Sequence, residues 1–181
     1  MSSTWILRFG EITLKSRPVQ KQFNRALFHN LHAVAYKRGV SLKAERFGAL
    51  HLVISDAEPE EVEQVLSRVL GVVAIDRVRI ICDDNKPDDI AKFVLENDDK
   101  FGQKRTFGVQ TKRLGTNYNW NSQSFSAAVG SEMLQRDPIL SVDLNNPEMS
   151  VKLIIEPERV WLLGEKIPGA GGLPSGVQGD V

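Results

Sequence analysis

The sequence predicts an α+β protein made of two small domains. Stretches in which apolar residues alternate with polar ones, as in half-buried strands, are interleaved with stretches in which apolar residues recur every three or four positions, as in amphipathic helices. The 181 residues are 41% hydrophobic and 25% charged, which is the composition of an ordinary globular chain. A polar break at residues 83–86, followed by Pro87, divides the chain into two blocks.

The first block, residues 1–82, is expected to hold four strands and two helices. The segment from Trp5 to Gly10 alternates apolar and other residues, which predicts the first strand. A helix bounded by Ser16 and Gly39 follows, because serine is preferred at the start of a helix and glycine just after its end. The remaining elements are strands at 42–47 and 49–54, a helix between Asp56 and Gly71, and a strand at 72–81. This β-α-β-β-α-β order predicts the ferredoxin-like fold, in which two helices cover one face of a four-stranded antiparallel sheet.

The second block, residues 83–167, has the pattern α-β-α-β-β. Its expected elements are a helix at 88–99, a strand at 105–112, a helix at 122–136, and strands at 150–155 and 160–164. Residues 168–181 are rich in glycine and proline and have no periodicity, which is typical of a linker.

The charges are unevenly distributed although the net charge is zero. Residues 1–55 carry nine basic and two acidic side chains, and residues 101–136 carry five and one; the two other segments are acidic. A neutral chain of this kind still presents a basic face if the two basic segments come together in the fold.

The first candidate binding surface is the long N-terminal helix. Arg17, Lys21 and Arg25 follow one another at steps of four, so they share a helical face on which like charges repel. Such a stripe favours an anionic partner, and Arg8 and Lys15 in the same block strengthen that interpretation. The alternative is a solvated helix face.

The second candidate surface is the stretch 104–126. A strand ends in Lys112 and Arg113, a polar loop follows, and a helix then begins near Ser122; a helix start favours phosphate through its unpaired backbone N–H groups. Amides and aromatic rings in the loop suit an unpaired base. The alternative is a surface loop with incidental polar residues. The candidate RNA contacts here are Lys104, Arg105, Lys112, Arg113, Asn117, Asn119, Trp120 and Ser122.

Other chemistry has no support in the sequence. Cys82 reads as the end of a buried strand, the three histidines lack metal-ligand spacing, and no nucleotide-binding or nucleophile motif occurs, so we expect neither a catalytic residue nor a metal site. The acidic residues at 83–89 read as a solvated helix start rather than a cation site. Since no membrane span or signal peptide is recognisable, the expected location is the cytoplasm, without a membrane partner.

Four segments resemble a known family, the tRNA 4-thiouridine synthases. RFGEITLKSRPVQKQF at 8–23 is similar to the opening motif of that family, and PGAGGLPSGVQG at 168–179 is similar to the linker that precedes its pyrophosphatase-loop domain. TFGVQTKR with the following NSQSFSAAVG, and DLNNPEMSVKLIIE at 143–156, resemble the RNA-binding THUMP domain. The THUMP signature has arginine in its strand where this chain has Gln110.

The resemblance implies a tRNA-binding region composed of a ferredoxin-like domain and an α/β THUMP domain. It implies that these grip the acceptor arm and the 3′ CCA end, so that uridine 8 is thiolated by an ATP-dependent domain, with a sulfur-donor protein and commonly within a homodimer. The SGGxDS loop that binds ATP in that family would follow Val181, so no cofactor is expected in this chain. The alternatives are a stand-alone adaptor that presents tRNA to a separate enzyme, and a protein-interaction or small-ligand domain without an RNA role.

Overall fold

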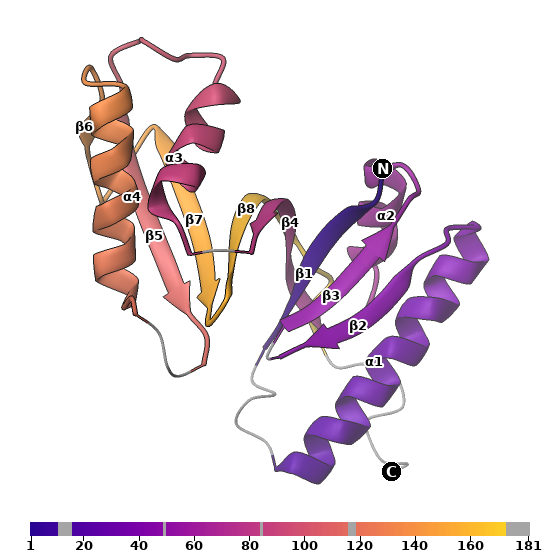
Figure 1. Cartoon of the computed structure of the whole chain (residues 1–181). Helices are drawn as coiled ribbons and strands as arrows, with labels where there is room; N and C mark the ends of the chain where they lie inside the picture. The colour runs from indigo at the N-terminus through magenta and orange to yellow at the C-terminus, as the bar shows by residue number, and fades with distance from the viewer. Residues whose placement is uncertain (11–15, 49, 84, 116–118, 173–181) are drawn as a thin grey trace. The chain divides into compact units, whose positions relative to one another are not determined.

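A computed structural model describes residues 1–10, 16–48, 50–83, 85–115 and 119–172. The chain divides into two compact units, of which unit 1 comprises Met1–Val78 with Glu165–Val181 and unit 2 comprises Arg79–Gly164. The elements of both are shown in Figure 1. In chain order they are β1 (Ser3–Phe9), α1 (Arg17–Arg38), β2 (Lys43–Phe47), β3 (Leu50–Ser55), α2 (Pro59–Leu66), β4 (Val72–Cys82), α3 (Pro87–Glu96), β5 (Thr106–Arg113), α4 (Ser122–Arg136), β6 (Ser141–Val142), β7 (Met149–Glu156) and β8 (Arg159–Pro168).

Unit 1 has the ferredoxin-like architecture that the element order predicts. Its strands lie in the order β2-β3-β1-β4, and the β1–β3, β1–β4 and β2–β3 pairs are all antiparallel. Helices α1 and α2 contact each other and pack on the sheet face that presents Trp5 and Leu7. The α+β class and the ferredoxin-like order are therefore confirmed.

Helix α1 ends where the sequence predicts. Gly39 adopts a left-handed conformation with φ 68°, which costs glycine little because it has no Cβ atom. The N–H of Gly39 donates to the Tyr36 carbonyl at 3.1 Å and the N–H of Val40 to that of Ala35 at 3.0 Å. These bonds use carbonyls that a helix end leaves without partners.

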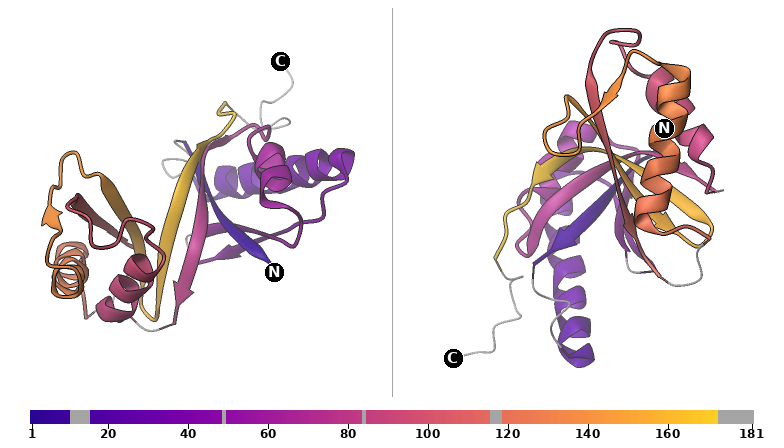
Figure 2. Two further views of the ribbon diagram at one scale, coloured as in Figure 1. Left: turned by 90° about the horizontal axis from the view of Figure 1, so that it is seen from above. Right: turned by 90° about the vertical axis from the view of Figure 1, so that its left-hand side faces the viewer.

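Unit 2 is a mixed sheet covered by two helices. Its strands lie in the order β8-β7-β5-β6; β5 runs parallel to β6 and β7, and β7 antiparallel to β8. Helices α3 and α4 contact each other on one face, as Figure 2 shows, and bury a core with Phe107, Phe125 and Met133 at its centre. The two-residue strand β6 is additional to the predicted pattern, because two residues are too few to show a period of two.

The segment after β8 pairs with β4 within unit 1. Gly169 N–H donates to the Val73 carbonyl at 3.0 Å, and Gly171 N–H to the Val72 carbonyl at 2.8 Å. A Cβ atom at Gly169 would lie 2.0 Å from the Val72 carbonyl oxygen, so this approach requires glycine. The described part of the predicted linker is thus bonded along β4 through residue 171.

Candidate nucleic-acid interface

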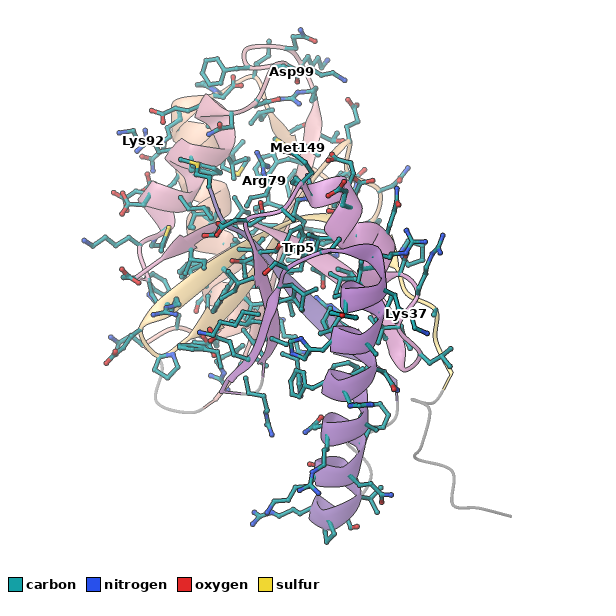
Figure 3. All side chains as sticks on the ribbon, turned by 90° about the vertical axis from the view of Figure 1, so that its right-hand side faces the viewer. Trp5, Lys37, Arg79, Lys92, Asp99 and Met149 are labelled. Atoms are coloured by element: carbon teal, nitrogen blue, oxygen red, sulfur yellow. The ribbon has the colours of Figure 1, made fainter. Side chains whose placement is uncertain are left out.

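The cations of α1 form an exposed stripe. Arg17, Lys21 and Arg25 are all exposed, while α1 turns a different side to the core of unit 1. The buried residues of the helix are Phe23, Leu27, Leu31 and Ala35. Figure 3 shows side chains projecting from α1 along its whole length, with Lys37 labelled toward its C-terminal end. The segment 17–38 contains no aspartate or glutamate, so the helix itself supplies no compensating charge.

A histidine anchors the side of α1 that faces the sheet. His51 Nε2 on β3 lies 3.2 Å from Asn24 Oδ1 on α1, and its ring packs edge-on against Phe9 at 4.6 Å between centroids. Burial and, as the smaller cause, the nearby positive charge of Arg46 together lower the pKa of His51 to about 4. The imidazole is therefore neutral near pH 7, as its half-buried position requires.

Two of the predicted RNA contacts, Arg8 and Arg105, form ion pairs with carboxylates of their own unit. The Arg8 side chain, 36% exposed, forms an ion pair with Asp76, which is almost completely buried. In unit 2, Arg105 is only 10% exposed and pairs with the equally buried Asp98. Removing either arginine would leave a buried carboxylate without its cation, so both have a structural role whatever else they contact. Lys104 is exposed.

The end of β5 and the start of α4 form the second surface. Lys112 and Arg113 are exposed at the last two positions of β5. Asn121 caps α4 with a capping box, in which Asn121 Oδ1 accepts from the Ser124 N–H at 2.8 Å and Ser124 Oγ from the Asn121 N–H at 3.0 Å. Ser122 is the first helical residue. The Asn121 side chain satisfies the backbone N–H of Ser124. The backbone N–H groups of Ser122 and Gln123 lie before it in the first turn of α4, where a helix leaves such groups without a partner inside the helix.

The loop before α4 is described in part. Trp120 is half-buried and meets Phe125 edge to face, with 5.6 Å between ring centroids, so it contributes to the core of unit 2. Asn119 is exposed. Lys15 and Asn117 lie outside the described residues. Contact of Trp120 or Asn119 with an unpaired base stays a prediction.

A groove that was not predicted from the sequence lies beside this surface. It has a volume of about 700 Å³ and lies along α4 and β5. The apolar lining residues are Phe107, Val109, Ala127, Gly130, Leu134, Val142 and Leu144, and the polar ones are Gln110, Thr111, Ser122, Gln123, Ser126 and Ser131. Ser126 Oγ donates to Thr111 Oγ1 at 2.8 Å and so ties helix to strand. The signal in the sequence is the small side chains at 122, 126 and 130, which lie at steps of four and leave this face of α4 open.

Two further features of the described residues concern metal binding and thiol reactivity. Among the described residues, no group of three or more histidine, cysteine or acidic side chains could hold a metal ion. Partial burial raises the pKa of the Cys82 thiol, and the negative charges of Asp89 and Asp83 raise it further, which disfavours the reactive thiolate. In the part of the chain that the structure describes, no helix is both long and apolar enough to span a membrane.

Comparison with known proteins defines the class of each unit. Residues 4–75 match the ThiI ferredoxin-like domain, and residues 85–163 match the THUMP domain. A solved structure from Pyrococcus horikoshii has a TM-score of 0.79 at 27% identity, with 97% of this chain and 58% of that chain covered. A 4-thiouridine synthetase crystallised with RNA and ATP has a TM-score of 0.68 at 26% identity, with 98% and 44% covered.

Curated relatives extend the same match. A tRNA sulfurtransferase from Shewanella piezotolerans is 30% identical over 177 residues, which cover 96% of this chain and 36% of that protein. A probable tRNA sulfurtransferase from Thermoanaerobacter is 31% identical over 183 residues, which cover 99% of this chain and 46% of that protein. The chain belongs to the ThiI family through its ferredoxin-like and THUMP domains. It spans less than half the length of these two relatives.

Proposed function

We propose that this chain binds tRNA through two basic surfaces, one on each unit. The first is the α1 stripe of Arg17, Lys21 and Arg25, and the second is the β5–α4 surface with Lys112 and Arg113. The observation that carries the proposal is the exposure of these cations in a chain of zero net charge, with no acidic residue in α1 to neutralise the stripe. Phosphate contacts of this kind supply most of the affinity of proteins for nucleic acids.

We propose further that the β5–α4 surface receives the unpaired 3′ CCA end and that the α1 stripe follows the acceptor arm. The groove supports this division, because its volume of about 700 Å³ and its mixed lining of apolar, hydroxyl and amide groups suit splayed nucleotides. Duplex RNA, in contrast, is recognised mainly through its backbone. The exposed cations of α1 suit the duplex part.

The proposed role in the cell is tRNA recognition for the thiolation of uridine 8. The names of the relatives, tRNA sulfurtransferases, support this role. The ATP-dependent step and the transfer of sulfur from a donor protein would belong to segments of those relatives outside the shared part. A homodimer, in which one subunit holds the tRNA end that the other modifies, is part of the same proposal.

Filter binding of a tRNA transcript at two salt concentrations tests the proposal. Affinity is expected to fall steeply with salt, and Lys112→Glu plus Arg113→Glu is expected to weaken binding about tenfold or more at 0.1 M salt because two phosphate contacts become repulsive. A matched control is Arg68→Glu plus Lys100→Glu, which reverses two exposed cations outside both surfaces. Binding that ignores salt, or that falls equally in both double variants, would show that the assignment is wrong.

A further inference from the structure

The outer edge of β5 is open along most of its length. Strand β6 covers this edge only at its start, where Phe107 pairs with Val142 in parallel register. The Asp143 N–H donates to the Phe107 carbonyl at 2.9 Å, and among the described residues no strand pairs with β5 beyond Phe107 on this side. An unpaired strand edge is a template to which another extended chain can add.

Alternation along β5 identifies the backbone groups that the open edge presents. The backbone groups of successive residues in a strand point to opposite sides. Because Phe107 turns its carbonyl toward β6, Val109 and Thr111 turn their N–H and C=O groups to the same edge. The Leu114 N–H donates to Ile155 at 2.9 Å, on the β7 side, in agreement with this alternation. Residues 109–113 extend over about 16 Å, which is room for an added strand of four or five residues.

The groove of about 700 Å³ lies between this edge and α4. None of the described residues that line it is charged. Ser126 and Gly130 leave the α4 side of the groove open, while Val142 and Leu144, which are 52% and 65% exposed, add apolar surface. An uncharged lining gives no counterion to a phosphate inside the groove, whereas it suits the neutral backbone and apolar side chains of a peptide.

One end of the groove is electropositive. Figure 1 shows that β5 ends and α4 begins on the same side of unit 2, so the exposed Lys112 and Arg113 share this end with the positive end of the α4 dipole. The segment 101–131, which supplies β5 and most of α4, contains no aspartate or glutamate. A strand that continues the line of β6 runs parallel to β5, and its C-terminus therefore arrives at the end that stabilises a carboxylate.

We propose that the groove between β5 and α4 docks the extended C-terminal segment of a partner protein. This segment adds to the open edge parallel to β5, places apolar side chains at alternate positions in the groove and sets its terminal carboxylate at the cationic end. Strand β6 shows the pattern, because Val142 lines the groove while the N–H of the next residue, Asp143, bonds to β5. The inference goes beyond the proposed function, since it gives the groove a protein ligand that would compete with the unpaired 3′ end.

Fluorescence anisotropy with a labelled octapeptide tests the inference on the full chain. The probe has valine at its last, third-last and fifth-last positions, serine or glutamate between them, and a free carboxylate. The chain is expected to bind it, and amidation of its C-terminus is expected to weaken binding about tenfold because a charge-assisted contact is lost. Binding that ignores amidation at 0.1 M salt would overturn the inference.

Methylation of the peptide's backbone nitrogens separates edge pairing from unspecific apolar binding. Methyl groups on the residues between the valines remove the donors that face β5 and should weaken binding roughly thirtyfold. Methyl groups on the valines, whose N–H groups face away from β5, should change binding less than about threefold. An equal effect of the two modifications contradicts addition to the edge.

Variants of the protein test the place of the peptide in the groove. Ala127→Trp and, as a second change outside the helix, Leu144→Asp should each weaken peptide binding about tenfold, because apolar contact in the groove is lost. Gln135→Trp, at an exposed position of α4 that does not line the groove, should leave binding unchanged. Far-UV circular dichroism checks that all three variants are folded. Peptide binding that both groove variants leave intact would place the peptide elsewhere and overturn the inference.

Binding of tRNA by the same preparation separates this inference from the proposed function. A chain that binds tRNA but not the peptide at about 1 mM has a groove for nucleotides alone, which overturns the inference and leaves the proposed function standing. A chain that binds the peptide but not tRNA supports the inference and overturns the proposed function. If both hold, intact tRNA displaces the peptide, and tRNA without its unpaired 3′ nucleotides does not.

Discussion

The two proposed RNA surfaces are built in different ways, although each lies on a helix that packs on a sheet. In α1 the first turn carries Arg17, which is unfavourable beside the positive end of the helix dipole, and among the described residues the Ser16 side chain makes no capping hydrogen bond. In α4 the first turn is capped by Asn121 and Ser124 and borders a groove. The first surface is thus defined by charge and the second by shape and hydrogen bonding.

We expect the largest effect on tRNA binding when the charges of the α1 stripe are reversed. Arg17→Glu plus Lys21→Glu plus Arg25→Glu should weaken tRNA binding about a hundredfold at 0.1 M salt and reduce the slope of log affinity against log salt by roughly 2 to 3, since three phosphate contacts are lost. Titrations at four salt concentrations measure both quantities. Reversal of Lys37, Arg68 and Lys100 is the matched control, and an equal loss there would remove the distinction between the stripe and general surface charge.

A smaller effect is expected when the groove is filled. Ala127→Trp places an indole in the groove, and we expect tRNA binding to weaken about tenfold while its salt dependence is preserved, because a stacked base and not a phosphate contact is lost. The same variant should bind tRNA without its unpaired 3′ nucleotides as well as the native chain does. Gln135→Trp, an exposed position on α4 that does not line the groove, is the control.

If Ala127→Trp weakened intact and shortened tRNA equally, the groove would have no part in holding the 3′ end. The comparison between the two surfaces would then reduce to charge alone.

The smallest expected effect concerns the two helix caps. Asn121→Ala should lower the free energy of unfolding by about 1 kcal/mol because the capping box is lost, whereas Ser16→Ala should change it by less than about 0.5 kcal/mol. Urea denaturation followed by circular dichroism measures both variants against the native chain. Equal destabilisation by the two substitutions would show that the α1 start is capped as firmly as the α4 start.

Periodic patterns made most of the fold predictable. Phe23, Leu27 and Leu31 recur at helical spacing and are buried in α1, and Gly39 takes the left-handed conformation expected of a helix end. The antiparallel order of unit 1 then follows from the sequence of elements. Strand β6 was missed because its pairing depends on β5 rather than on any pattern of its own.

The candidate site was less predictable, because partners that no periodic pattern identifies decide what each side chain does. Arg8 and Arg105 have the same residue type as Arg25, yet Asp76 and Asp98 hold them while Arg25 is exposed. Trp120 is a predicted contact of an unpaired base, and no pattern in the sequence indicates that its ring also meets Phe125. These pairings join residues 68, 7 and 5 positions apart, and only the folded chain brings them together.

The bonds from Gly169 and Gly171 to β4 have a consequence for the order of synthesis. Unit 1 is discontinuous, since residues 1–78 and the segment from Glu165 are separated in the chain by the whole of unit 2. The ribosome therefore synthesises every residue of unit 2 before it adds Gly169 and Gly171, whose backbone N–H groups bond to β4. Unit 2 has the topology of an insertion into its neighbour, and a chain interrupted at Gly164 would keep all of unit 2 while leaving unit 1 unfinished.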